Sequence, residues 1–401
     1  MQEKNFSYPQ IAQKLPSEVK KLFEIFGDDI RLVGGSVRDL ILQKNISDFD
    51  FAIRILPDEV MKILQKNNIL AVPTGIKYGT VSAVLSGRNF EITTLRKDQN
   101  QKGRDTDVEF VDDFYEDAAR RDFTINALYL DSQGLVTDYF DGISDLKKQK
   151  VKFIGDANKR IEEDFLRILR FFRFSCEYAK SLDKSGLAAC ISQKENLKKL
   201  SVERIRQEFF KLLTSRKKEN LFKILRILKS KKIAAEILPS LDIKALEQLF
   251  ELQENSSSKL KIAVLLLNKK TDLEKLFPQI CATNDEKKFL RFLSQNSPTL
   301  DLADLKQLLA LYEKELVLEL YIFCLTKTKS TKPQHLDFLN KFSLPKFPLT
   351  ASDLMALGFK DKALGDALFE AKKFWAKNDF LVEKNSLISH VKKYRSAKDF
   401  E

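Results

Sequence analysis

The hydrophobic residues follow different periods in the two parts of the chain. Up to Leu146, short apolar runs recur between polar turns, which is typical of strands. Val81–Leu85 and Phe90–Thr94, on either side of a turn that contains Gly87, predict a hairpin. Ser17–Phe26 and Leu56–Asn67 have the spacing of amphipathic helices. The first part should therefore combine strands with helices.

After Leu146 the strand pattern almost disappears and helical spacing takes over. The clearest case is Lys159–Tyr178, which is predicted to be one continuous helix. Ser201–Leu213 reads as another amphipathic helix with Ser201 as its cap. In the first part, Phe114–Leu130 is also predicted to be a helix. Arg96–Val108, which is polar and has no apolar period, is predicted to be a mobile loop that includes Gly103 and Arg104.

Three acidic residues in the first part suggest a metal site. Asp48 and Asp50 fall in a predicted strand, where residues two apart share a face, so both carboxylates should project together, away from Phe49 and Phe51. Glu91 is the single acid in another apolar strand. Clustered carboxylates repel one another unless a cation lies between them, and Mg²⁺ is the usual cation in phosphate chemistry. We therefore predict Asp48, Asp50 and Glu91 as metal ligands.

Two further groups of residues suggest phosphate binding. Gly34 and Gly35 follow an apolar strand and begin a short helical stretch with Ser36 and Arg38, where a phosphate could approach backbone N–H groups. Later in the chain stand neighbouring guanidinium, carboxylate and amide groups, which belong to Arg120, Arg121, Asp122 and Asn126. Guanidinium groups make bidentate contacts with phosphates, although solvated helix arginines would give the same sequence pattern.

The polar side of Lys159–Tyr178 carries Asp164, Arg167, Arg170 and Arg173 at intervals of three residues, so we expect a ramp of charges along the exposed flank. Intrahelical salt bridges are the ordinary explanation of such a pattern. A carboxylate can, however, accept from an exocyclic amine while a guanidinium donates to a ring nitrogen or carbonyl. The pair Asp164 and Arg167 could therefore accept cytosine and adenine and reject uracil and guanine.

The charges are distributed unevenly along the 401 residues. Of 69 Lys and Arg and 57 Asp and Glu, only 18 and 24 lie in residues 1–145, a net charge of −6, and the remainder carries +18. A basic second part favours a polyanionic partner. No apolar run approaches the roughly 20 residues that span a membrane. The four cysteines show no metal-binding spacing, so we expect free thiols and a cytoplasmic protein.

Five motifs occur in the order found in one enzyme family. They are GGSVRD with DFD (Gly34–Asp39 and Asp48–Asp50), RRDFTINAL (Arg120–Leu128), DYFDGISDL (Asp138–Leu146), EEDFLRILRFFRF (Glu162–Phe174) and SVERIRQEF (Ser201–Phe209). In these motifs the chain resembles the class II tRNA nucleotidyltransferases, or CCA-adding enzymes, and their poly(A) polymerase relatives. The resemblance covers about the first half of the chain.

The resemblance implies an α+β fold: a polymerase-β-like nucleotidyltransferase head with a mixed β-sheet, then an all-α neck, body and tail. We expect the head in residues 1–145, the neck, which selects the base, in 146–215, the body in 216–330 and the tail, which binds tRNA, in 331–401. It also implies two Mg²⁺ ions, with catalytic ligands Asp48, Asp50 and Glu91. Nucleotide contacts are expected from Gly34, Gly35, Ser36, Arg38, Arg121, Asp122, Asn126, Asp164, Arg167, Arg170 and Arg173.

The expected activity is template-independent addition of C, C and A to the 3′ end of tRNA. CTP and ATP are the substrates, pyrophosphate is released, and the tRNA acceptor arm is the partner; no membrane and no partner protein is indicated. Three alternatives stay open: a poly(A) polymerase, an enzyme that adds only A, and a non-catalytic RNA-binding protein. The last is the least favoured, because a binding module has no use for clustered carboxylates.

Overall fold

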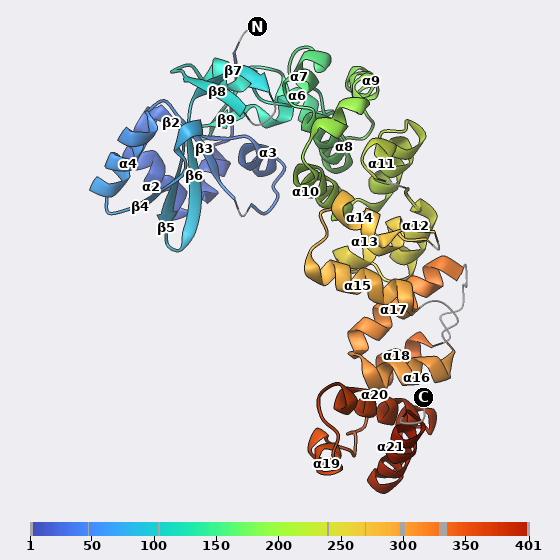
Figure 1. Cartoon of the computed structure of the whole chain (residues 1–401). Coiled ribbons are helices and arrows are strands. Elements are labelled where there is room, and N and C mark those ends of the chain that lie inside the picture. The colour runs from blue at the N-terminus through green and yellow to red at the C-terminus, as the bar shows by residue number, and fades with distance from the viewer. Residues whose placement is uncertain are drawn as a thin grey trace. The chain divides into compact units, whose positions relative to one another are not determined.

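The computed structural model describes residues 3–46, 48–102, 105–238, 240–268, 270–296, 301–328 and 335–398. The chain forms two compact units, Met1–Ile237 and Leu238–Glu401. In the described residues all strands lie in the first unit (Figure 1). The predicted order of a mixed-sheet head and a helical remainder is confirmed. The finer division into head, neck, body and tail stays a prediction, and its boundary at residue 330 lies outside the described residues.

The first unit is built on an eight-stranded sheet with the order β1-β10-β9-β2-β3-β6-β5-β4. The pair β3 and β6 is parallel and the other neighbours are antiparallel, so the sheet is mixed. The strands are β1 (Lys4–Ser7), β2 (Ile30–Val33), β3 (Asp50–Ile53), β4 (Leu70–Gly75), β5 (Thr80–Leu85), β6 (Arg88–Thr94), β9 (Leu128–Leu130) and β10 (Leu135–Asp138). The predicted hairpin is β5–β6.

Apolar residues cover both faces of this sheet. On one face, Phe51 and Phe90 join the core formed with α2 (Ser17–Phe26) and α4 (Pro57–Lys66). On the other face, Ala52 packs with residues of α5 (Phe114–Ala119). Strand alternation produces this division, because successive side chains point to opposite faces. Helices α2 and α4 agree with the sequence prediction.

The first unit also contains many helices. Its other helices are α1 (Pro9–Lys14), α3 (Gly35–Ile41), α6 (Gly142–Lys147), α7 (Ala157–Glu163), α8 (Leu166–Tyr178), α9 (Lys184–Ser192), α10 (Val202–Leu213) and α11 (Lys218–Ser230). Helix α8 packs against α10 and α11. The sequence prediction for Ser201–Leu213 holds as α10, although the Ser201 side chain makes no capping hydrogen bond.

The prediction of one helix over Lys159–Tyr178 is wrong. Asp164 has an extended backbone (φ −152°, ψ 107°) and separates α7 from α8. Its Oδ1 accepts a hydrogen bond from the Leu166 backbone N–H at 3.1 Å, so the carboxylate caps the new helix. The apolar period continues across the break, which is why hydrophobic spacing alone did not reveal it.

The prediction of a helix over Phe114–Leu130 is also wrong. Helix α5 ends at Ala119, a single 3₁₀ turn covers Thr124–Asn126, and β9 follows. The Asp122 carboxylate accepts from the Phe123 N–H at 2.8 Å. The Thr124 N–H donates to the Lys152 carbonyl at 3.0 Å, so backbone pairing with a distant segment replaces helical hydrogen bonds.

The polar stretch predicted to be a loop contains two paired strands, β7 (Arg96–Lys102) and β8 (Asp105–Phe110). Their backbones pair although their sequence has no apolar period, so the hydrophobic pattern gave no sign of them. Gly103 and Arg104, which the loop prediction included, lie outside the described residues.

The second unit is helical throughout its described residues. Its helices are α12 (Ile243–Leu252), α13 (Ser258–Leu266), α14 (Leu273–Gln279), α15 (Asn284–Gln295), α16 (Leu302–Leu311), α17 (Lys314–Thr328), α18 (Leu336–Lys341), α19 (Ala351–Ala356), α20 (Asp361–Lys377) and α21 (Lys384–Lys398). Trp375 lies in a core between α20 and α21. None of the described helices has the length and apolar character to cross a membrane.

Candidate active site

Two of the predicted metal ligands are neighbours in the sheet. Asp50 begins β3 and pairs in register with Glu91 of the parallel strand β6. Both residues are exposed, whereas Phe51 and Phe90, next to them in the sequence, are buried on the opposite face. The register therefore places the two carboxylates side by side on one face of the sheet.

Asp48 is held differently from the prediction, because β3 begins only at Asp50 and Asp48 precedes the strand. The alternation argument therefore applies to Asp50 and Glu91, not to Asp48. The Ser36 hydroxyl donates to the Asp48 carbonyl and accepts from the Asp50 N–H, both at 3.1 Å. Buried Ser36 thus ties the acidic segment to the start of α3.

The electrostatics of Asp50 show that its neighbours form one group. The protein around its carboxylate displaces water, and this desolvation raises its pKa although the residue is exposed. The negative charges of Glu91 and Asp48 raise the pKa further, while Arg121 lowers it. Mutual repulsion of this kind is what a bound cation would relieve.

These oxygen ligands are of the kind that Mg²⁺ prefers. Among the described residues, no group of three or more acidic, His or Cys side chains is already arranged around a metal position. The shared face and the raised pKa of Asp50 fit a cation that draws the carboxylates together when it binds.

The predicted phosphate cradle lies beside this cluster. Gly34 has φ +72°, which favours glycine, and its N–H donates to the Leu128 carbonyl at 3.1 Å. A Cβ at Gly34 would lie 3.4 Å from Nη1 of Arg121, so the guanidinium stands directly over the glycine. Since Arg121 also acts on the pKa of Asp50, the structure brings together the glycine pair, this arginine and the acids.

Arg121 is oriented by a buried carboxylate that the sequence analysis did not single out. Its Nη2 donates to Asp117 at 2.8 Å, and Tyr129 donates to the same carboxylate at 2.7 Å. Burial acts to raise the pKa of Asp117, but Arg121 and Arg120 outweigh it and hold that pKa well below its usual value. Asp117 lies four residues before Arg121, a spacing at which residues near a helix can contact each other. This spacing was the signal available in the sequence.

Four other predicted nucleotide ligands form a chain of contacts. Arg38 is buried, and its Nη1 donates to Oδ1 of Asn126 at 2.5 Å. Nδ2 of Asn126 donates to Asp122 at 3.0 Å, so these two residues, which the sequence places near each other, are in contact. Asp122 also accepts from Arg170 at 2.7 Å. Burial acts to raise the pKa of Asp122, but Arg170 and Asn126 hold it below its usual value. Nucleotide binding by these residues stays a prediction.

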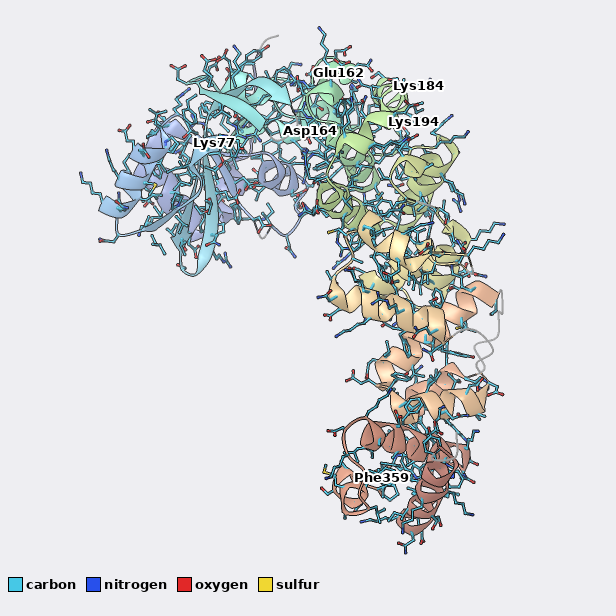
Figure 2. The ribbon with its side chains drawn as sticks, viewed as in Figure 1. Lys77, Glu162, Asp164, Lys184, Lys194 and Phe359 are labelled. Atoms are coloured by element: carbon cyan, nitrogen blue, oxygen red, sulfur yellow. The ribbon has the colours of Figure 1, made fainter. Side chains whose placement is uncertain are left out.

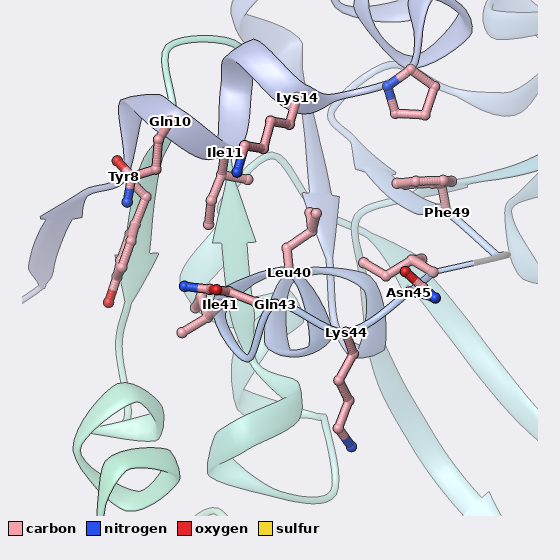
Figure 3. Close-up of a pocket in the computed structure, with 12 residues that line it drawn as sticks. Tyr8, Gln10, Ile11, Lys14, Leu40, Ile41, Gln43, Lys44, Asn45 and Phe49 are labelled. Atoms are coloured by element: carbon pink, nitrogen blue, oxygen red, sulfur yellow. The ribbon is translucent and has the colours of Figure 1, made fainter.

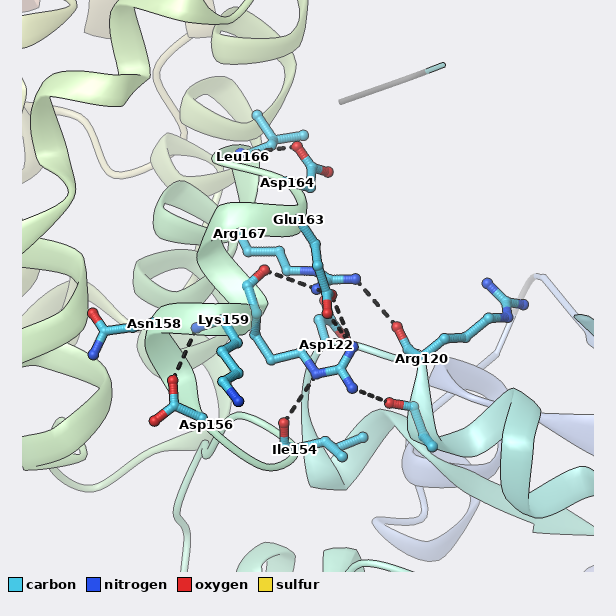
Figure 4. Close-up of polar contacts among 12 residues, drawn as sticks. Arg120, Asp122, Ile154, Asp156, Asn158, Lys159, Glu163, Asp164, Leu166 and Arg167 are labelled. Carbon is cyan, nitrogen blue, oxygen red and sulfur yellow. Dashed lines mark hydrogen bonds and ion pairs between the residues drawn. The ribbon is translucent and has the colours of Figure 1, made fainter. Parts of the chain in front are cut away.

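The predicted ramp of charges is not an exposed flank. Arg167 is buried, and its guanidinium pairs with Glu163 and donates to the Arg120 carbonyl at 3.1 Å (Figure 4). Arg173 is half-buried and donates to Glu208 of α10 at 2.6 Å. Each of these two arginines therefore has a carboxylate partner in the protein.

Asp164 lies at the junction of α7 and α8 (Figure 2). It accepts a hydrogen bond from Arg204 of α10 at 2.7 Å and does not form an ion pair with Arg167. Arg204 and Glu208, which both lie in the motif Ser201–Phe209, thus contact Asp164 and Arg173. Whether Asp164 and Arg167 select the base stays a prediction.

Arg160 was also missed by the sequence analysis. It lies on α7, donates to the Ile154 carbonyl at 3.1 Å and to Glu163 at 2.8 Å, and contacts the Ala119 carbonyl. The Ala119 carbonyl lies 41 residues away in the sequence, so no motif spacing could have indicated that contact.

A pocket of about 530 Å³ lies beside α3 in the first unit (Figure 3). It is lined by residues of α1, α3 and the segment that follows α3, among them Lys14, Leu40, Lys44 and Phe49. None of the predicted site residues is in its lining. The carboxylate cluster, which is built on the sheet, is therefore a separate feature.

Comparisons with known proteins agree with this geometry. Residues 30–152 match the poly A polymerase head domain, and residues 181–244 match the probable RNA and SrmB-binding site of polymerase A. The first match contains the carboxylate cluster and the glycine pair. It defines the chain as a nucleotidyltransferase of the poly(A) polymerase head-domain class.

Relatives identify the family more narrowly. The mitochondrial CCA tRNA nucleotidyltransferase 1 of Homo sapiens is 32% identical over 409 residues, which cover 96% of this chain and 92% of that protein. The CCA-adding enzyme of Lactobacillus delbrueckii subsp. bulgaricus is 41% identical over 214 residues, which cover 53% and 52% of the two chains. The chain belongs to the CCA tRNA nucleotidyltransferase family.

Solved structures share the fold. The CCA-adding enzyme of Bacillus stearothermophilus in complex with CTP has a TM-score of 0.75 and 23% identity, and the match covers 96% of this chain and 100% of that one. The Thermotoga maritima CCA-adding enzyme complexed with tRNA has a TM-score of 0.70 and 21% identity, with coverage of 98% and 100%. The similarity of fold thus includes the second unit, for which the sequence offered no motif.

Proposed function

We propose that this protein adds C, C and A to the 3′ end of tRNA, using CTP and ATP. The observation that carries the proposal is the similarity over almost the whole chain to enzymes named for this activity. The sheet supports it, since Asp50 and Glu91 lie in register beside the glycine pair.

The reaction is a displacement at phosphorus. The 3′-hydroxyl oxygen of tRNA bonds to the α-phosphorus of CTP or ATP, the bond to the β-phosphate oxygen breaks, and pyrophosphate leaves with its electron pair. The hydroxyl proton passes to solvent. The product carries one more nucleotide and a new 3′-hydroxyl, so the same step can repeat.

Asp48, Asp50 and Glu91 would hold Mg²⁺. When bound, the metal neutralises phosphate charge and lowers the pKa of the attacking hydroxyl. The protein supplies the positions: β3 and β6 fix Asp50 and Glu91, and Ser36 fixes the backbone on both sides of Phe49.

Arg121 is the basic residue best placed to contact the triphosphate. It stands over Gly34, where no side chain separates the backbone from a ligand. Asp117 accepts from its Nε and Nη2 and Tyr129 accepts from its Nε, while its Nη1 faces Gly34. An arginine held in this way can orient a phosphate without first losing its own side-chain freedom.

Base selection is proposed for Asp164 and Arg167, whose edges complement cytosine and adenine. The structure adds a condition, because each is already paired: Asp164 with Arg204 and Arg167 with Glu163. A nucleotide would have to exchange with these partners or share them. Arg204 and Glu163 would then set the geometry of the selecting pair.

The tRNA acceptor arm is the proposed partner of the basic part of the chain. Contacts to an RNA helix should recognise phosphates and shape rather than sequence. We also propose a cytoplasmic location. The relatives from zebrafish, human and mouse are named as mitochondrial proteins, so cell fractionation should compare the cytoplasm with mitochondria.

The first test of the proposal is Asp48→Ala in the full chain. Incorporation of labelled CTP into tRNA that lacks CCA should fall by at least about a thousandfold, since a metal ligand is lost. Binding of the same tRNA, measured by filter retention, should change less than about twofold, because Asp48 lies outside the basic part. Parallel loss of activity and binding would show that the acids have a structural role instead.

A further inference from the structure

Tyr178, near the end of α8, contacts the helix that follows the glycine pair. Its hydroxyl donates to Oδ1 of Asp39 in α3 at 2.9 Å. The guanidinium carbon of Arg38 lies 4.1 Å from the centre of its ring, and Nζ of Lys44 lies 4.3 Å from it. One tyrosine of the helical part thus contacts three residues in and after α3.

The contacts of Tyr178 continue into the head. The Asp39 carboxylate accepts from Nε and Nη2 of Arg38 at 3.1 and 2.7 Å. Arg38 in turn contacts Asn126, which contacts Asp122, and Asp122 pairs with Arg170 of α8. Helix α8 is therefore tied to the head at two points, Arg170 and Tyr178, through one chain of polar contacts.

Helix α3 also leads to the carboxylates. Ser36, in its first turn, holds the backbone of Asp48 and Asp50. The helix has seven residues, so Ser36 and Asp39 lie on neighbouring turns of a rigid element. A shift of α3 at Asp39 would move Ser36, and with it the acidic segment.

We propose that Tyr178 is a positioning residue, which acts through Asp39 and Arg38 to hold α3, and so Asp48 and Asp50, in a fixed place relative to α8. The inference rests on the proposed function, since the placement matters for joining a nucleotide bound near α8 to the carboxylates. In this proposal Arg38 links α3 to α8.

The state of the phenol supports this role. Burial raises the pKa of Tyr178, and the Asp39 hydrogen bond acts in the same direction. The hydroxyl therefore keeps its proton at neutral pH and remains a donor to the carboxylate. A neutral donor facing an ionised acceptor makes one of the stronger side-chain hydrogen bonds.

The test compares Tyr178→Phe, Asp39→Asn and the double variant. Tyr178→Phe keeps the ring contacts and removes only the hydroxyl. Its kcat for CTP addition to tRNA lacking CCA should fall about tenfold, while KM for CTP stays within about twofold. In the Asp39→Asn background, the same substitution should cost less than about twofold, because the hydroxyl acts through Asp39.

Hydrogen exchange gives a measurement that does not depend on catalysis. In Tyr178→Phe, amides of α3 should exchange about tenfold faster than in the wild type, because a contact that holds the helix is gone. Tyr115→Phe is the matched control: its ring packs on Phe140, away from the contacts described for Tyr178, in the same unit. That control should leave kcat and α3 exchange unchanged.

Unchanged exchange of α3 in Tyr178→Phe would overturn the inference whatever the enzyme does. The inference would also be overturned if Tyr178→Phe lowered kcat as much in the Asp39→Asn background as in the wild type. A wild-type protein that adds no nucleotide would instead refute the proposed function, and the exchange experiment would still decide whether Tyr178 holds α3.

Discussion

At the scale of single residues, the acids show how function opposes stability. Asp50 begins a strand beside Glu91, where desolvation and like charge raise its pKa. A carboxyl that is harder to ionise in the folded state than in the unfolded state destabilises the fold at neutral pH. Its position therefore does not favour folding, and the metal proposed for this cluster would account for it.

Asp50→Asn should remove activity and raise stability. Without metal, and at pH 7, the variant should melt about 1–2 °C higher than the wild type, because the amide carries no charge to repel Glu91. Thermal unfolding in the presence of a chelator measures this. Incorporation of CTP by the same preparation should be abolished.

The sign of the pH dependence follows from the raised pKa of Asp50. As pH falls through that raised value toward the ordinary value of 3.8, the wild-type carboxyl becomes protonated and its penalty disappears. The difference in melting temperature between variant and wild type should shrink over that range. A difference that grows toward acid pH would contradict the account of this residue.

Asp164 and Arg167 carry the prediction about base choice. Asp164→Ala and Arg167→Ala should each let UTP or GTP be incorporated, or lower CTP and ATP incorporation by at least about tenfold, since the complementary edge is lost. Single-turnover incorporation of all four nucleotides checks this. Normal rates with UTP and GTP still excluded would place base selection elsewhere.

Residue types could be predicted from the sequence better than residue contacts. Asp50 and the lone acid Glu91 lie in apolar strands, so their shared face was predictable, whereas Asp48 precedes its strand. The contact of Arg167 with the Arg120 carbonyl was not predictable, because that carbonyl belongs to another segment and the contact depends on packing between segments. Its other partner, Glu163, lies only four residues away.

At the scale of elements, backbone hydrogen bonds explain the differences from the sequence prediction. Strands β5 and β6 and helix α4 were predicted because apolar periodicity records burial. The break between α7 and α8 leaves that period intact and depends on the Asp164 side chain. Segment 120–130 leaves helical geometry because residues 152–154 offer backbone partners.

At Gly142, which begins α6, the backbone of another segment approaches closely. A Cβ there would lie 2.2 Å from the Thr124 carbonyl oxygen. Gly142→Ala should lower the free energy of unfolding by about 1–3 kcal/mol, because the backbone must move to relieve the overlap. Urea denaturation followed by circular dichroism measures the change.

Gly365→Ala is the matched control for this prediction. Gly365 lies inside α20, and nothing stands within 4 Å of the added Cβ. Alanine should raise the free energy of unfolding by about 0.5–1 kcal/mol, since it favours the helix. Equal effects of the two substitutions would show that the contact with Thr124 is not what requires glycine at position 142.

At the scale of the whole molecule, the sequence predicted a mixed sheet followed by a helical remainder. The structure has this order, since all described strands lie in the first unit. The family motifs end at Phe209, so little of the second unit could be assigned from them. Helical composition gave its fold class. Its individual helices depend on packing between segments, which a single sequence does not record.

The activity of the whole chain is tested most directly by the ends of its products. Purified wild-type protein is given tRNA that lacks CCA, together with CTP, ATP and Mg²⁺, and the products are sequenced at their 3′ ends. The account predicts C, C and A added in that order, with no further nucleotides. Long A tails, addition of A alone to tRNA already ending in CC, or no addition at all would contradict it.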